Sequence, residues 1–389
     1  MNKRLKIIRV VTSSECVPWH MGNTLKRIHA DFDVCVVGQN VSKFKGQFPG
    51  VEWVDINISR KIDLSADLSA LIALYRLFRR YQPDIVHSIM PKAGLLTALA
   101  GFLCRVPVRL HTFTGQVWAN LSGMPRLYFY MLDRVVVLLN TTCLTDSPSQ
   151  SQYLFDHGIS HKHGPLPVLG RGSLIGVDLN RFDLNKTADG AKKLRAKLGM
   201  NESEFIFSFI ARKSLDKGCI DVLHAFNEVL KRNSTARLLY VGPDESEGEL
   251  DRLRKSNSWL FENVIEIDRV SNHEEYLAIS NVLCLPSYRE GFGTIVIDAA
   301  ALSIPTIGSD IVGLVDSIED GKTGILFPAG NIKRLAEIML LFSKDQAATQ
   351  QMGLLARKRV EEFFSADILY LALKDFYLQA AQKVTRTQI

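Results

Sequence analysis

Short apolar runs rich in β-branched residues alternate along the whole chain with longer amphipathic stretches. This alternation is typical of parallel sheets flanked by helices. In the first half, helices are expected at 65–81 and 91–104. Strands are expected at 5–12, 33–37, 51–56, 85–89, 108–113 and 143–146.

The same pattern restarts in the second half, where strands are expected at 205–210, 237–241, 264–267, 282–286, 305–308 and 324–327. A cluster of Gly and Pro at 163–176 interrupts it and marks a crossing between domains. A length of 389 residues suits two domains. We therefore expect an α/β chain with Rossmann-like domains at 1–172 and 173–365, and an amphipathic helix at 366–389 that packs back across them.

Composition narrows the class of protein. Hydrophobic residues make up 47% and charged residues 23% of the chain, as in a globular protein. The six cysteines are scattered singly and are expected to be reduced. The basic N-terminus breaks into polar residues too early for a signal peptide, and no apolar stretch reaches the roughly 20 residues of a spanning helix. A cytoplasmic location without a membrane span is expected.

Two common nucleotide-binding motifs are missing. The first expected strand is followed by a segment with one glycine, Gly22, where a dinucleotide fingerprint needs three. The Gly-Lys-Thr at 321–323 has Asp316 where a phosphate-binding loop needs its upstream glycine. Binding of NAD or FAD and hydrolysis of ATP are therefore disfavoured.

The most informative motif follows the expected strand at 282–286 and reads SYREGFGTIVIDAA. A loop with two glycines leads into a helix, so the backbone amides of Gly293, Thr294 and Ile295 can bind a phosphate. Glu290 at the mouth can accept hydrogen bonds from a sugar, and Asp298, about two turns on, from a ribose. The motif predicts a site for a sugar nucleotide.

These residues resemble the retaining GT-B glycosyltransferases of family 4, whose hallmark is a glutamate, seven residues, and a second glutamate. Asp298 is one methylene shorter than that second glutamate. Further matches, in the family's order, are the interdomain segment at 176–182, ARKSLDKG at 211–218, and the last strands near 305–310 and 320–328. The resemblance implies a GT-B fold of two Rossmann-like domains facing each other across a cleft.

The resemblance also implies roles for the donor site. Arg212 and Lys217 would hold the diphosphate and neutralise the leaving group, with Lys217 opening a helix that extends to 231. Together with Glu290, they are the expected catalytic residues of the second domain. The donor-binding set comprises Gly242, Arg269, Val270, Gly291, Phe292, Gly293, Thr294, Ile295 and Asp298.

In the first half the resemblance points to His111 as a catalytic histidine in the cleft, close to the transferred sugar. The segment that contains His87 and Lys92 resembles the corresponding segment in the capsule and O-antigen branch of the family. Both histidines lie in or near the ends of apolar strands, the edge where parallel sheets place ligands. The expected acceptor-side residues are His87, Lys92, Thr114, Gly115 and Gln116.

No metal site and no cofactor are expected. The early acidic pair Asp31 and Asp33 opens a strand instead of closing one, so it is badly placed to bind a divalent ion on UDP. The leaving group would be stabilised by Arg212, Lys217 and helix amides. Since no pair of carboxylates is confidently set across one sugar face, attack from the side of the departing diphosphate, with retention, is favoured over double displacement.

The implied reaction moves a hexose or N-acetylhexosamine from a UDP-sugar to an undecaprenyl-diphosphate-linked sugar in bacterial polysaccharide assembly. A nucleotide-sugar epimerase on the same scaffold and a catalytically silent sugar-nucleotide-binding protein are the alternatives. An epimerase would turn over its donor without an acceptor, and a silent protein would bind it only. No nucleic-acid partner is expected.

The net charge of +6 is unevenly divided, with +9 over residues 1–175 and −3 over residues 176–389. The basic half would face anionic lipid on the inner leaflet, so peripheral attachment to that membrane surface is expected. Apolar residues near the cleft rim, Trp118, Leu121, Met124 and Tyr128, would assist it.

Overall fold

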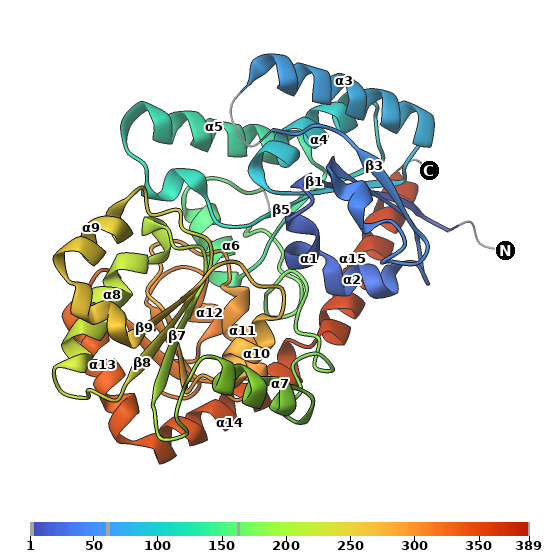
Figure 1. Cartoon of the computed structure of the whole chain (residues 1–389). Coiled ribbons are helices and arrows are strands. Elements are labelled where there is room, and N and C mark those ends of the chain that lie inside the picture. The colour runs from blue at the N-terminus through green and yellow to red at the C-terminus, as the bar shows by residue number, and fades with distance from the viewer. Residues whose placement is uncertain (1–3, 60–62, 162–163, 388–389) are drawn as a thin grey trace. The chain divides into compact units, whose positions relative to one another are not determined.

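The computed structural model describes residues 4–59, 63–161 and 164–387. The chain divides into two compact units (Figure 1). Unit 1 comprises the chain up to Gly176 together with the residues from Ala366 onward, and unit 2 is Val177–Ser365. The division falls a few residues after the boundary expected at 172.

Within the described residues, unit 1 is built on a parallel sheet of six strands in the order β3-β2-β1-β4-β5-β6. The strands are β1 (Lys6–Ser13), β2 (Asp33–Gln39), β3 (Val51–Asp55), β4 (Ile85–Ile89), β5 (Val108–Phe113) and β6 (Thr142–Thr145). The helices are α1 (Cys16–His20), α2 (Gly22–Ile28), α3 (Leu64–Tyr81), α4 (Pro91–Leu103), α5 (Gly123–Leu139), α6 (Pro148–Asp156) and α15 (Ala366–Thr387), with 3₁₀ turns η1 (Val41–Phe44) and η2 (Val117–Asn120).

Helices cover both faces of this sheet, so its strands are buried on both sides. Alternate residues of β1 serve the two faces: Ile7 and Val11 pack in the core beneath α2 and α15, whereas Ile8 and Val10 pack beneath α3 and α4. The same alternation along β4 and β5 decides which way every polar side chain in these strands points.

Unit 2 repeats the plan, with six parallel strands in the described chain in the order β12-β11-β10-β7-β8-β9. The strands are β7 (Ile206–Ile210), β8 (Arg237–Val241), β9 (Val264–Ile267), β10 (Val282–Leu285), β11 (Thr306–Ser309) and β12 (Gly324–Phe327). The helices are α7 (Leu184–Lys197), α8 (Cys219–Leu230), α9 (Glu249–Ser256), α10 (His273–Ala278), α11 (Thr294–Ala301), α12 (Leu314–Ser317), α13 (Ile332–Lys344) and α14 (Gln346–Phe363), with 3₁₀ turns η3 (Leu215–Lys217) and η4 (Ser258–Asn263).

The last helix, α15, belongs to unit 1 and packs against α2. Asp31 anchors it by accepting a hydrogen bond from Tyr370 and by pairing with Lys374 at 2.6 Å. Arg27 of α2 reaches Asp367 at 2.7 Å. The first carboxylate of the early acidic pair is thus a structural anchor of the C-terminal helix.

Two expectations from the sequence, the lack of a membrane-spanning helix and a helix that begins at Lys217, can be compared with the structure. No helix in the described part of the chain is both long enough and apolar enough to span a bilayer. Lys217 does not open a helix, because it ends the turn η3 and α8 begins two residues later at Cys219.

Candidate active site

The strand order of unit 2 marks where a ligand would bind. From β7 the chain proceeds outward through β8 and β9, and from the neighbouring β10 it proceeds the other way through β11 and β12. In such sheets ligands bind outside the carboxyl ends of the strands at this switch point. The loops that follow β7 and β10 meet there, and they carry Lys217 and Glu290.

Lys217 and Glu290 form the centre of this site. The Lys217 ammonium lies 2.5 Å from Oε1 of Glu290, and both side chains are largely buried. The Ser287 hydroxyl donates to the same oxygen at 2.9 Å. The carboxylate is therefore fixed in place, and Oε2, the oxygen that these two contacts leave unused, is an acceptor for a ligand hydroxyl.

Gly218 allows the two loops to lie this close. It adopts a left-handed conformation with φ of +67°, and a Cβ atom there would lie 2.1 Å from the carbonyl oxygen of Pro286. Any side chain at this position would push the loop after β7 away from the loop after β10. The contact between Lys217 and Glu290 depends on this glycine.

Arg212 lies in a second charged cluster beside this pair. It contacts Glu245 at 2.5 Å and Asp216 at 3.5 Å, and Asp216 is also 3.4 Å from Arg289. Burial raises the pKa of Asp216, but the Ser214 hydrogen bond and the nearby cations outweigh it and hold the pKa below its ordinary value. The sequence reasoning missed Asp216 and Arg289. Their signals were the spacing of four residues from Arg212 to Asp216 and the position of Arg289 next to Glu290.

The N-terminus of α11 adds backbone donors to the same edge. Gly293 precedes the helix in a left-handed conformation, and no side chain caps it. In the described chain, the amides of Thr294 and Ile295 donate to no acceptor. The glycine loop Gly291 to Gly293 is anchored by Phe292, which is buried in the core. Unpaired amides and the helix dipole make this an anion site beside the cations.

Asp298 lies on the second turn of α11, where its carboxylate is 3.0 Å from Nε2 of His273 on α10. Sequence reasoning missed His273, which no motif singled out. Of the other expected donor residues, Gly242 directly follows β8, and its amide donates to the carbonyl oxygen of Ile267 at 3.1 Å. Arg269 and Val270 follow β9, with Arg269 exposed and Val270 half-buried.

Both expected histidines of unit 1, the acceptor-side His87 and the cleft histidine His111, are buried beneath helices. His111 is 1% exposed and faces α4, and its Nδ1 lies 3.0 Å from the hydroxyl of Ser88 on the neighbouring strand β4. A Cβ at Gly94 would lie 2.4 Å from its ring, so the ring fills the space that this glycine leaves. His87 points to the opposite face and contacts Tyr377 of α15 at 2.6 Å.

Burial also sets the charge of these rings. Desolvation lowers the pKa of His111 to about 3, and it lowers that of His87 far below the ordinary range. Both are therefore neutral at pH 7. In this structure His111 packs the sheet against α4, and neither histidine is accessible to a sugar.

The remaining acceptor-side residues are more dispersed than expected. Lys92 is the second residue of α4 and pairs with Asp67 of α3 at 2.8 Å. Thr114 and Gly115 follow β5 and are half-exposed at the sheet edge. Gln116 is buried, and its carbonyl oxygen accepts a hydrogen bond from Gln150 at 3.2 Å. Among these residues, Thr114 and Gly115 have the accessible positions.

Two family models together match most of the chain. The model for glycosyl transferases group 1 matches residues 190–359, and the one for a glycosyl transferase 4-like domain matches residues 18–165. The chain belongs to the GT-B glycosyltransferases of family 4. Both models follow the two-unit division, and the group 1 model contains the loops that carry Lys217 and Glu290.

Relatives and structures of known proteins agree with this membership. The glycosyltransferase is 29% identical to the capsular polysaccharide biosynthesis glycosyltransferase CapM of Staphylococcus aureus, over 96% of this chain and 97% of CapM. It is 23% identical to an Escherichia coli UDP-Gal:alpha-D-GlcNAc-diphosphoundecaprenol alpha-1,3-galactosyltransferase, over 82% of each chain. Anabaena HepE in complex with UDP has the same fold, with a TM-score of 0.76, 16% identity and coverage of 96% of this chain and 100% of HepE.

One apolar residue that the sequence assigned to the rim of this glycosyltransferase's cleft lies inside unit 1. Trp118 is 1% exposed, and its indole donates to Asp133 of α5 at 2.8 Å. It therefore cannot insert into a membrane. Met124 and Tyr128, by contrast, lie exposed on α5, and Leu121 is half-buried.

Proposed function

We propose that this glycosyltransferase moves a hexose or N-acetylhexosamine from a UDP-sugar to an undecaprenyl-diphosphate-linked sugar, with retention, during assembly of a bacterial surface polysaccharide. The observation that carries the proposal is the group of Lys217, Glu290 and unpaired α11 amides at the switch point of unit 2. A diphosphate is bound by cations and backbone amides, and a sugar is bound by a fixed carboxylate. The carboxyl edge of the unit 2 sheet supplies both kinds of group.

The charges of the site support a role in leaving-group stabilisation. Lys217, Arg212 and Arg289 are all paired with carboxylates. A bound diphosphate would compete for these cations, and the negative charge that grows as the glycosidic bond breaks would strengthen their attraction. In this proposal Oε2 of Glu290, which contacts neither Lys217 nor Ser287, accepts hydrogen bonds from the sugar.

We propose retention without a covalent intermediate, because Glu290 is better placed to orient the sugar than to attack it. Its carboxylate is tied to Lys217 and Ser287, which suits an orienting acceptor better than a nucleophile. We favour attack from the face of the departing diphosphate, which takes the proton of the acceptor hydroxyl as its own bond to the sugar breaks. The protein then contributes positioning and electrostatic stabilisation.

Similarity to known proteins supports the substrate classes. HepE has been solved with UDP, and the E. coli relative is named for a UDP-galactose donor and a diphosphoundecaprenol-linked acceptor. CapM, similar over nearly its whole length, is named for capsular polysaccharide biosynthesis. A lipid-linked acceptor requires the enzyme to work at a membrane surface, which we place at the inner leaflet.

The helices α3, α4 and α5 offer a surface for this attachment, called here the α3–α5 surface. Helix α4 contacts both α3 and α5, which makes the three helices neighbours on one side of the unit 1 sheet (Figure 1). Exposed apolar side chains on them are Leu64, Leu68, Ile72, Tyr75, Phe102, Leu103, Met124, Leu127, Tyr128, Met131 and Leu138. Exposed arginines accompany them at 76, 79, 80, 126 and 134. Apolar and basic side chains together suit an anionic bilayer.

A thermal-shift screen of nucleotides and nucleotide sugars tests the donor site directly. UDP and at least one UDP-sugar should raise the melting temperature, because a ligand that binds only the native state stabilises it. EDTA should leave the shift unchanged, because the proposal gives the diphosphate to Arg and Lys side chains instead of a metal. If no nucleotide stabilised the protein, or if stabilisation required added manganese, the donor proposal would fail in its present form.

A further inference from the structure

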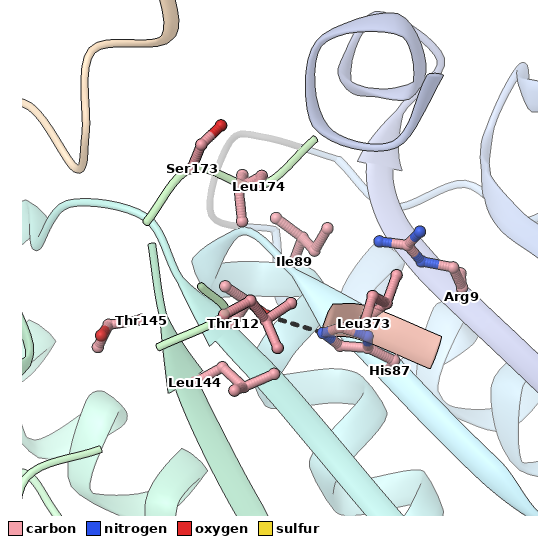
Figure 2. A pocket seen from close by; sticks show the side chains of 10 residues that line it. Arg9, His87, Ile89, Thr112, Leu144, Thr145, Ser173, Leu174 and Leu373 are labelled. Atoms are coloured by element: carbon pink, nitrogen blue, oxygen red, sulfur yellow. Dashed lines mark hydrogen bonds between the residues drawn. The ribbon is translucent and has the colours of Figure 1, made fainter. Parts of the chain in front are cut away.

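A small cavity lies inside unit 1, on the α15 face of its sheet (Figure 2). Its polar lining consists of Arg9, His87, Thr112, Thr145 and Ser173. Its apolar lining consists of Ile89, Leu144, and leucines of α15 and of the segment at 169–174. Arg9 and His87 are register partners on β1 and β4. The cavity volume is about 10 Å³, enough for the centre of one water-sized particle.

Arg9 is a buried cation without a counter-charge. Its side chain is 2% exposed, and its Nη1 donates to the Thr24 hydroxyl at 2.9 Å. Its Nε has no hydrogen-bond acceptor among the residues that the structure describes. No aspartate or glutamate in the described residues pairs with this guanidinium. A buried charge normally persists only when it is paired, because desolvation carries a large penalty.

The other groups around Arg9 do not supply the missing negative charge. His87 is hydrogen-bonded to Tyr377 and, at 2.8 Å, to the Thr112 hydroxyl, so both ring nitrogens are used. Burial, together with the charge of Arg9, keeps the pKa of His87 low and this ring neutral. Burial raises the pKa of Tyr377, so its phenol stays protonated.

We propose that the cavity binds a small inorganic anion of the size of chloride, held by the guanidinium of Arg9. Its volume of about 10 Å³ suits a single small particle and is too small for a polyatomic anion such as phosphate. A water molecule would satisfy Nε but would leave the positive charge uncompensated. At the other side of the cavity, the Ser173 hydroxyl accepts a hydrogen bond from the Gly176 amide at 3.2 Å, so the guanidinium of Arg9 is the group that holds the anion.

The lining suggests what such an anion would stabilise. Leu373 comes from α15, and Leu169, Ser173 and Leu174 come from the segment that precedes the end of unit 1 at Gly176. Both elements pack over Arg9 on the same face of the sheet. A bound anion removes the penalty for covering the guanidinium, so it favours the docked positions of α15 and of this segment within unit 1.

Crystals grown with bromide in place of chloride test the site by anomalous scattering. We expect a bromide peak within hydrogen-bonding distance of the Arg9 guanidinium in the wild-type protein and none there in Arg9→Met. The absence of a peak at Arg9 in wild-type crystals, or density there that fits water alone, would overturn the proposal.

Thermal unfolding gives a second measurement, in sodium chloride and in sodium gluconate at equal ionic strength. Chloride at a hundredfold excess over its Kd should raise the wild-type Tm by about 3 °C or more relative to gluconate. Arg9→Met should show no difference, whereas Arg232→Met, which removes an exposed arginine, should behave as wild type. If Arg9→Met fails to fold, the wild-type comparison still decides, because equal Tm values in the two salts would contradict the proposal.

Discussion

At the scale of single residues, strand position decides which polar side chains can act. His87 and His111 lie within β4 and β5, whose two faces are both covered by helices, so both rings are buried. Thr114 lies one residue beyond Phe113, the end of β5, and remains half-exposed. The family resemblance points to His111 as a cleft residue, whereas its position within β5 buries its ring in unit 1. In unit 2 the expected residues fall in the loops after strands, and there Lys217 and Glu290 do meet.

The prediction at this scale concerns Arg212 and Lys217. Replacing either with Ala should lower turnover about 10²- to 10³-fold, because each would remove one charge contact to the leaving diphosphate. Steady-state kinetics with the donor identified by thermal shift would measure it. Arg232→Ala, on the surface of the same unit, is the matched control and should turn over as wild type. Full activity in both the Arg212 and Lys217 variants would contradict the diphosphate assignment.

At the scale of elements, much of the fold follows from the sequence. Five strands, β4, β5, β8, β9 and β12, match the expected ranges end for end. Buried parallel strands are continuous apolar runs, and their flanking helices are long enough to show a period. The prediction that a helix begins at Lys217 is wrong for a local reason. Gly218 turns left-handed and splits a short 3₁₀ turn from α8, which hydrophobic periodicity cannot detect.

Asp133 of α5 should make the free energy of unfolding depend on pH. Burial raises the pKa of Asp133 to about 7, although the Trp118 hydrogen bond opposes this. The unfolded chain releases this proton near pH 4, so the folded state loses stability as the pH rises from about 4 to 7. Asp133→Asn keeps an acceptor for Trp118 and cannot ionise. Its Tm should equal that of wild type near pH 4 and exceed it by about 3 °C or more at pH 8.

The matched control for this experiment is Asp375→Asn, which removes an exposed carboxylate of α15. Its Tm difference from wild type should not change with pH. If Asp133→Asn showed the same flat profile, the carboxyl would be ionised in the folded protein across this range, contrary to the account.

The α3–α5 surface should bind anionic liposomes in proportion to its exposed apolar and basic groups. Binding should weaken as salt rises from roughly 0.05 to 0.5 M, because the Debye length shrinks severalfold. Met124 is 75% exposed and Leu127 is 51% exposed, so the double variant Met124→Ser with Leu127→Ser should bind less. Leu354→Ser, which removes an exposed leucine of α14 in unit 2, should bind as wild type. Equal sedimentation with neutral and anionic liposomes would contradict this attachment and favour a soluble acceptor.

At the scale of the whole molecule, the proposed transfer needs a donor site in unit 2 and a membrane-bound acceptor that reaches the protein through the α3–α5 surface of unit 1. The sequence predicted the two-unit α/β architecture because length, alternation and the Gly/Pro break agree on it. It could not predict Glu245 beside Arg212, or His273 beside Asp298, because these contacts join separate loops and helices. Side-chain pairing across loops depends on tertiary structure, which hydrophobic patterns do not encode.

The measurement that tests the central claim most directly is a transfer assay with a labelled UDP-sugar, run with and without a polyprenyl-diphosphate-linked sugar, followed by NMR of the product. The account predicts UDP release and a new glycosidic bond only when the acceptor is present, with the anomeric configuration of the donor retained. Donor conversion without acceptor would indicate an epimerase, and donor binding without any conversion would indicate a silent sugar-nucleotide-binding protein. Either result, or a product of inverted configuration, would contradict the proposed retaining transfer.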